Sequence, residues 1–224
     1  MRVRAFMAGL ATVAVLAGCG GLDTARSTGG GDDAKPDSAT ISDAKKKLKD
    51  LAVKGRAPKT GFDRDEFGPA WSDVDRNGCD TRNDILKRDL EEETFKSGTH
   101  DCIVLTGTLD DPYSGKTIKF KRGQDTSTAV QIDHVIPLSD AWQKGAQQWS
   151  DTKRKEFAND PLNLMAVDGP LNGQKSDSDA ATWLPPRKSY RCTYIAKQVE
   201  VKAKYELWVT SAEKDAMQGI LDGC

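Results

Sequence analysis

The 224-residue sequence predicts an α+β fold in which helices outnumber strands. Several segments begin with a capping residue and have the composition of helices. Short runs rich in branched residues, bounded by turn-forming residues, occur only between residues 102 and 167 and indicate a small antiparallel sheet. The chain has no internal repeat, so one folded domain is expected.

The N-terminus has the features of an export signal. An arginine-containing start precedes an almost uniformly apolar run at residues 5–16, which is too short to span a bilayer as an ordinary helix. Residues 16–19, Leu-Ala-Gly-Cys, resemble a bacterial lipobox. We therefore expect residues 1–18 to be a lipoprotein signal peptide and Cys19 to carry the acyl chains of an outward-facing membrane anchor. A plain secretory signal with a chance cysteine is the alternative.

A polar stretch separates this signal from the folded part. Residues 20–39 contain Gly, Asp, Ser and Thr but almost no bulky apolar side chain. Such a stretch cannot bury enough surface to offset its ordering entropy, so residues 19–40 are expected to be the lipidated cysteine and a flexible linker. The apolar content and the five tryptophans that follow predict one domain at residues 41–224.

The first half of the domain is expected to hold two helices and a hairpin. A capping serine opens a short helix at residues 42–53, and a second helix is expected at residues 81–95. Branched residues predict a strand at 102–109, and a turn at 110–115 returns the chain to a partner strand at 116–120. The aromatic residues expected to anchor the stretch between the helices are Phe62, Phe67 and Trp71.

The second half begins with a strand at residues 129–136, which Pro137 ends. The remaining elements are expected to be helices at 139–150 and 152–159, a brief strand at 162–167, a turn at 168–170, helices at 171–181 and 192–208, and a last helix that runs from a capping box at Thr210 to Gly223.

Four cysteines lie within the domain, namely Cys79, Cys102, Cys192 and Cys224. None belongs to a C-x-x-C pair, which argues against a structural zinc site. In an exported chain they indicate two disulfides, with three possible pairings. We favour Cys79–Cys102 and Cys192–Cys224, because each bridge then stays local to one half of the domain.

Overall charge gives no support to nucleic-acid binding. The net charge is −1, and loss of the two arginines in residues 1–18 leaves −3, whereas a general polyanion binder is usually basic. Local basic residues could form a phosphate-tracking groove, or they could equally be solvated surface. They are Lys116, Lys119, Lys121, Arg122, Arg187, Lys188, Arg191, Lys197, Lys202 and Lys204. No aromatic pattern suggests base readout, so binding without sequence specificity is expected.

The candidate chemistry centres on a histidine. The chain has two, and His100 lies in a polar stretch expected at the surface. His134 follows Asp133 at the end of a predicted strand, before Pro137. Neighbouring side chains on a regular strand point to opposite faces, so the strand must end or bend here if both residues serve one site.

Two further segments complete a recognisable order. Asn163 follows His134 by 29 residues within an Asn-Leu pair, and Asn172 and Lys175 form an N-x-x-K pattern beyond it. This order resembles the HNH family, in the Asp-His-Asn variant found in CRISPR effector HNH domains. More narrowly, residues 78–224 resemble secreted actinobacterial HNH-family proteins related to the C-terminal domain of GmrSD restriction enzymes. The shared motifs are Gly78-Cys79-Asp80-Thr81-Arg82, Asp111-Pro112-Tyr113-Ser114-Gly115, Phe157-Ala158-Asn159-Asp160 and Trp183-Leu184-Pro185-Pro186.

This resemblance implies a ββα-metal core with surrounding helices and a metal-dependent endonuclease that acts on DNA, with RNA left open. His134 would be the general base that activates water. Asp133 and Asn172 would hold one divalent ion through hard oxygen donors that suit Mg²⁺ or Mn²⁺. Asn163 would pin the loop between the strands and so orient His134. Lys175, one helical turn after Asn172, could reach a phosphate oxygen.

Each of these residues also has an ordinary structural interpretation. Asp133 could end a strand, Asn172 could cap a helix, Asn163 could be a turn residue and Lys175 could be solvated. The alternative function is a non-catalytic exported lipoprotein that uses the HNH scaffold as a binding module; a surface structural protein would not need this constellation. We expect a monomer whose partners are nucleic acid and, through the lipid anchor only, the membrane.

Overall fold

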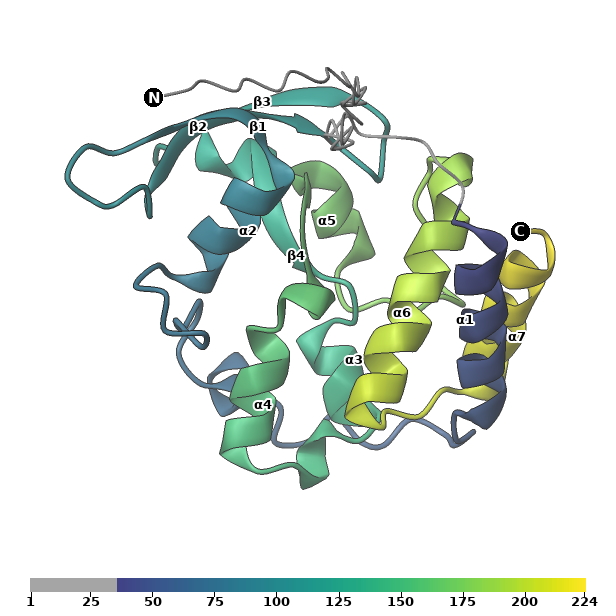
Figure 1. Cartoon of the computed structure of the whole chain (residues 1–224). Coiled ribbons are helices and arrows are strands. Elements are labelled where there is room, and N and C mark those ends of the chain that lie inside the picture. The colour runs from purple at the N-terminus through teal and green to yellow at the C-terminus, as the bar shows by residue number, and fades with distance from the viewer. Residues whose placement is uncertain (1–35) are drawn as a thin grey trace, which may run out of the picture. The chain divides into compact units, whose positions relative to one another are not determined.

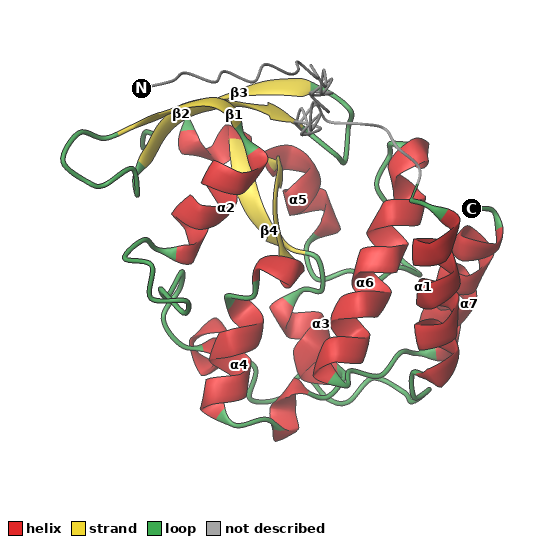
Figure 2. Ribbon diagram, in the orientation of Figure 1, coloured by secondary structure: helices red, strands yellow, loops and turns green. Residues whose placement is uncertain are grey.

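The computed structural model describes residues 36–224. The predicted signal peptide, Cys19 and most of the predicted linker therefore lie outside the described residues. Helices predominate and the strands form two small antiparallel sheets, so the predicted α+β class is confirmed (Figure 2). None of the helices in residues 36–224 has the length and apolar character needed to span a membrane.

The helices are α1 Ser38–Asp50, α2 Thr81–Asp89, α3 Leu138–Gln143, α4 Asp151–Ala158, α5 Gly169–Lys175, α6 Arg191–Tyr205 and α7 Ser211–Asp222. The strands are β1 Glu91–Phe95, β2 Val104–Asp110, β3 Thr117–Lys121, β4 Val130–His134 and β5 Leu164–Asp168.

Helices α1, α6 and α7 lie side by side (Figure 1). Helix α1 begins earlier than the expected residue 42, because the Asp37 side chain caps it by accepting a hydrogen bond from the Thr40 amide at 2.6 Å. Its buried residues Ile41, Ala44 and Leu48 have the spacing of one helical face, and they join the apolar core shared with α6 and α7.

The larger sheet has the order β1-β2-β3, with all neighbours antiparallel. The expectation of one helix over residues 81–95 was wrong in its second half, because α2 ends at Asp89 and β1 follows. Thr94 pairs with Thr106 across the sheet, and their hydroxyl oxygens lie 2.6 Å apart. These cross-strand contacts override the helical tendency of the glutamates at the start of β1.

The smaller sheet pairs β4 with β5 and leads directly into α5. In its register Asp133 lies opposite Met165, and His134 lies opposite Leu164. Gly169 permits the tight exit from β5, because a Cβ atom there would collide with the carbonyl oxygen of Thr128.

Two further predicted helices are shorter than expected. Helix α5 begins at Gly169 and ends at Lys175, short of residue 181, because Ser176 adopts a positive φ of 49°. The helix expected at 139–150 ends at Gln143, because Gly145, at φ 137°, breaks it before a short 3-10 turn. The structure forms the Cys79–Cys102 and Cys192–Cys224 disulfides, the pairing that local spacing favours.

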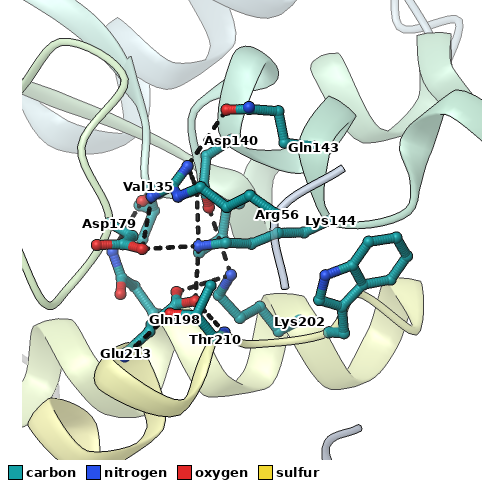
Figure 3. A network of polar contacts seen from close by, with 12 residues as sticks. Arg56, Val135, Asp140, Gln143, Lys144, Asp179, Gln198, Lys202, Thr210 and Glu213 are labelled. Carbon is teal, nitrogen blue, oxygen red and sulfur yellow. Dashed lines mark hydrogen bonds and ion pairs between the residues drawn. The ribbon is translucent and has the colours of Figure 1, made fainter. Parts of the chain in front are cut away.

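A buried ionic cluster joins α3, α6 and α7 to the chain on either side of them (Figure 3). The Nζ of Lys144 lies 2.7 Å from Asp140, 2.9 Å from Asp179 and 2.6 Å from Glu213. Lys202 lies 2.9 Å from Glu213, and Arg56 lies 2.9 Å from Asp140 and 2.6 Å from Asp179. Three positive charges thus balance three negative charges. Arg56 borders solvent, and the balance lets the other five groups remain buried. This ionic cluster consists of Arg56, Asp140, Lys144, Asp179, Lys202 and Glu213.

Candidate active site

A cavity of about 310 Å³, here called the site cavity, opens beside the end of β4. Asp133, His134 and Asn172 are among the residues that line it, so the structure brings three of the predicted site residues together. Asn163 and Lys175 are fully buried and do not line the cavity; they contact its walls from behind.

Asp133 is buried and its carboxylate has two protein partners. Oδ2 accepts a hydrogen bond from the Tyr113 hydroxyl at 2.5 Å, and Oδ1 accepts one from Lys175 Nζ at 2.8 Å. Burial and the adjacent carboxylate raise the pKa of Tyr113 well above its ordinary value, so the phenol remains a donor. Since a carboxylate has about four acceptor positions, Asp133 retains acceptor capacity toward the cavity.

His134 makes its contacts away from those of Asp133, as the alternation of a strand requires. Its Nε2 lies 2.9 Å from the carbonyl oxygen of Ala158, which can only accept. Nε2 therefore carries the hydrogen, and Nδ1 keeps its lone pair. Burial, with the cations of Arg64 and Lys175, lowers the pKa of His134 to about 4 despite the opposing effect of the bond to Ala158. The imidazole is thus neutral at neutral pH.

Asn163 fastens the backbone just beyond His134. Its Oδ1 accepts a hydrogen bond from the Ile136 amide at 2.8 Å, and its Nδ2 donates to the Ile136 carbonyl at 3.3 Å. The Asn163 carbonyl also accepts from the Val135 amide at 2.8 Å. The side chain thus extends the β4–β5 ladder past the end of the strand and fixes how the chain leaves it.

The two residues on α5 differ in their exposure. Lys175 Nζ is enclosed and donates to Asp133 Oδ1 and, at 2.7 Å, to the His134 carbonyl. Asn172 borders the cavity, and its Nδ2 donates to Gln131 Oε1 at 2.9 Å. This bond directs the amide nitrogen of Asn172 to Gln131 and leaves Oδ1 as its acceptor atom.

The donor atoms at the cavity suit a hard divalent ion that keeps most of its water. Asp133 and Asn172 each offer an oxygen, the ligand type that Mg²⁺ and Mn²⁺ prefer. Within residues 36–224, no group of three or more His, Cys, Asp or Glu side chains is arranged to hold a metal. An ion here would therefore depend on these two residues, on water and on a phosphate of the substrate.

Three residues near the site were not predicted to belong to it. Tyr113 belongs to the Asp-Pro-Tyr-Ser-Gly turn, a motif quoted above for the resemblance without a function. Trp71 stacks on His134, with ring centroids 6.0 Å apart and an interplanar angle of 14°. Arg64 borders the cavity from a short 3-10 helix, Arg64–Phe67. No sequence signal places Trp71 or Arg64 beside His134, because both lie more than sixty residues before it.

The other basic and histidine positions are less central. His100 is exposed, as expected. Lys202, which could have lined a phosphate-tracking groove, is instead fully buried in the ionic cluster, because two acidic partners hold it there. Arg122 donates to the Val104 carbonyl at 2.6 Å and to Asn83 Oδ1 at 2.5 Å. Its guanidinium therefore connects β2 to α2.

Comparison with known proteins identifies the family. Residues 80–220 match the family described as GmrSD restriction endonucleases, C-terminal domain. The chain belongs to this family. Membership of this family indicates a nuclease-type function and contact with nucleic acid. The matched range contains every residue that the sequence placed in the site.

An "uncharacterized secreted protein" of the fungus Arthroderma benhamiae is 37% identical over 191 residues, which cover 84% of this chain and 88% of that protein. Its description as secreted supports export. This relative is fungal, whereas the shared sequence motifs pointed to actinobacterial proteins. No solved structure matches the chain.

Proposed function

We propose that this member of the GmrSD family is a metal-dependent HNH-type endonuclease that hydrolyses phosphodiester bonds in DNA, with RNA as a second substrate class to test. The observation that carries the proposal is the hydrogen bond between His134 Nε2 and the Ala158 carbonyl. It leaves Nδ1 as the basic atom of a neutral imidazole at a cavity that also presents Asp133 and Asn172. The order β4, β5, α5 is that of an HNH ββα core and supports the assignment.

Each residue has a proposed task. His134 Nδ1 would accept a proton from the water that attacks phosphorus. Asp133 and Asn172 would hold one Mg²⁺ or Mn²⁺, which when bound would stabilise negative charge on the phosphate. Asn163, through its two bonds to Ile136, would keep His134 in position. Lys175 would act as the counter-ion that holds Asp133 in place, and its enclosure gives it no path to a phosphate oxygen.

The test is digestion of supercoiled plasmid, linear DNA and RNA by the purified protein with Mg²⁺, Mn²⁺ or EDTA. His134→Ala should abolish cleavage while leaving the thermal unfolding temperature close to that of wild type. His100→Ala is the matched control, because His100 is exposed and outside the cavity, and it should cleave normally. If wild type binds DNA but never cleaves it, the binding-module alternative holds and the catalytic proposal fails.

We further propose that residues 1–18 direct export and that Cys19 carries a lipid anchor. The secreted description of the fungal relative supports export, and the lipobox-like sequence supports the anchor. Cys19→Ser should move the protein from the membrane fraction to the soluble fraction of the producing cells or their medium. Retention of this variant in membranes would exclude the anchor.

A further inference from the structure

Part of the lining of the site cavity comes from a segment outside the family match. Residues 59–71 precede the matched range 80–220, yet they supply Arg64 to the site cavity and Trp71 to the face of His134. The site of this chain therefore includes a part that the family relationship does not describe.

This segment is firmly attached to the domain. Phe67 is buried and packs against Trp142 and Phe157, with ring centroids 6.3 Å and 6.1 Å away. Arg154 Nε donates to the Glu66 carbonyl at 2.7 Å, and Asp63 caps the short helix by accepting from the Asp65 amide at 3.0 Å. Arg64 therefore lies in a capped helical turn that Glu66 and Phe67 attach to the domain.

Arg64 and His134 border two cavities, the site cavity and a second one. The second, here called the flanking cavity, has a volume of about 200 Å³ and is bordered by Trp71. Arg64, His134 and Leu138 are the residues that border both cavities. A chain threaded past His134 from one cavity to the other would therefore pass Arg64.

The charges around the site cavity single out Arg64. Lys59 is paired with Asp177 at 2.9 Å, and Asp133 is paired with Lys175 at 2.8 Å. Arg64 is exposed and has no hydrogen bond or ion pair to any residue in the described part of the chain. Asp65 borders only the flanking cavity. The uncompensated charge at the site cavity is therefore positive, and it attracts an anion.

We propose that the Arg64 guanidinium binds the phosphodiester at the site cavity, donating to its non-bridging oxygens. This inference rests on the proposed nuclease function and adds a substrate-binding residue to it. A guanidinium has a planar fork of donors that matches two phosphate oxygens and remains charged at all working pH values. It would place the phosphate next to His134 whatever the base sequence, since phosphate contacts carry no sequence information.

The test measures binding separately from cleavage. A fluorescein-labelled DNA duplex is titrated with the His134→Ala protein in EDTA, and with the same protein carrying Arg64→Ala, Arg64→Lys or Arg76→Ala. Arg76 is an exposed arginine that borders neither cavity, so it controls for loss of general positive charge. Thermal unfolding should be unchanged in all variants, because the Arg64 side chain has no partner to lose.

Arg64→Ala should weaken binding roughly tenfold, as expected for loss of a charge-assisted hydrogen bond. It should also make the slope of log K against log salt shallower by about 0.9, the value for one phosphate contact on a duplex. Arg64→Lys should keep the slope but recover only part of the affinity, because lysine keeps the charge without the fork.

Two failures remain distinguishable. If wild-type protein cleaves DNA and Arg64→Ala matches Arg76→Ala in affinity, salt slope and the KM for cleavage, the Arg64 inference is overturned and the nuclease proposal stands. If wild-type protein neither binds nor cleaves DNA or RNA, the nuclease proposal itself fails, and the Arg64 inference fails with it.

Discussion

The Nζ of Lys175 lies 2.8 Å from Asp133 Oδ1, and this buried ion pair connects α5 to β4 at the proposed site. The same ammonium reaches the His134 carbonyl at 2.7 Å. A single side chain therefore neutralises the carboxylate of Asp133 and fixes the backbone at His134.

Lys175→Met should be strongly destabilising. The substitution keeps the length of the side chain but leaves Asp133 buried without its counter-ion, which costs about 3–5 kcal/mol of unfolding free energy. Urea denaturation followed by circular dichroism measures the change. The double variant Asp133→Asn with Lys175→Met should recover most of the loss, because neither charge remains. A loss below about 1 kcal/mol for the single variant would show that the pair is open to solvent.

Asn163→Ala should free the backbone after β4. Both hydrogen bonds to Ile136 are lost in a fully buried place, and a cost of about 2–4 kcal/mol is expected for two unsatisfied backbone groups. Hydrogen exchange at the Ile136 amide should accelerate by more than exchange at the amides of β4. Asn163→Asp retains the acceptor for that amide and should protect it better. Equal exchange at Ile136 in wild type and Asn163→Ala would contradict the role given to Asn163.

The ionic cluster should cause the free energy of unfolding to fall as the solution becomes acidic. Burial acts to raise the pKa of Asp179, but Lys144 and Arg56 outweigh it and hold the pKa below the ordinary 3.8. Because the folded value is the lower one, the stabilisation is present above the ordinary pKa and is lost as the pH falls through the folded value. Asp179→Asn should lower the free energy of unfolding at about pH 5 and flatten its fall toward about pH 3.

Asp222→Asn is the matched comparison for that series. The pKa of Asp222 is also lowered, chiefly by its hydrogen bond with Lys45, but the group is exposed and solvent screens the pair. Urea midpoints across the pH range should therefore follow wild type for this variant. If Asp179→Asn and Asp222→Asn gave the same pH profile, the cluster would not be the source of the acid sensitivity.

His134 should titrate far below the ordinary histidine pKa of 6.5 in the metal-free protein. With only two histidines, their ring resonances can be followed separately by NMR in EDTA. The His134 signal should remain that of neutral imidazole until the pH falls to about 4. Trp71→Ala removes the ring that stacks on the imidazole and should raise this pKa by admitting water. A His134 titration near the ordinary 6.5 in wild type would show that the ring is solvated.

The fold class and most elements could be predicted from the sequence, because capping residues and branched runs act over a few residues. The disulfide pairing could be predicted because each bridge lies within one half of the domain. Strand β1 did not, since its glutamates become a strand only by pairing with β2. The early end of α5 depends on Ser176 taking a positive φ, for which serine gives no signal.

The grouping of Asp133, His134 and Asn172 followed from the order of motifs, but their contacts did not. Lys175 is buried because it pairs with the buried Asp133, and the sequence alone does not show that Asp133 is buried. Trp71 and Arg64 reach His134 only through folding of a segment far away in the chain, so tertiary structure alone identifies them.

The ionic cluster has a practical consequence for where this protein can be cut. Arg56 precedes the family-matched range 80–220, yet its guanidinium neutralises Asp140 and Asp179 inside that range. A fragment trimmed to the matched range would also lose α1, whose apolar face covers α6. The smallest autonomous folding unit should therefore start before Ser38, and recombinant fragments or domain swaps designed from the family boundaries alone should aggregate.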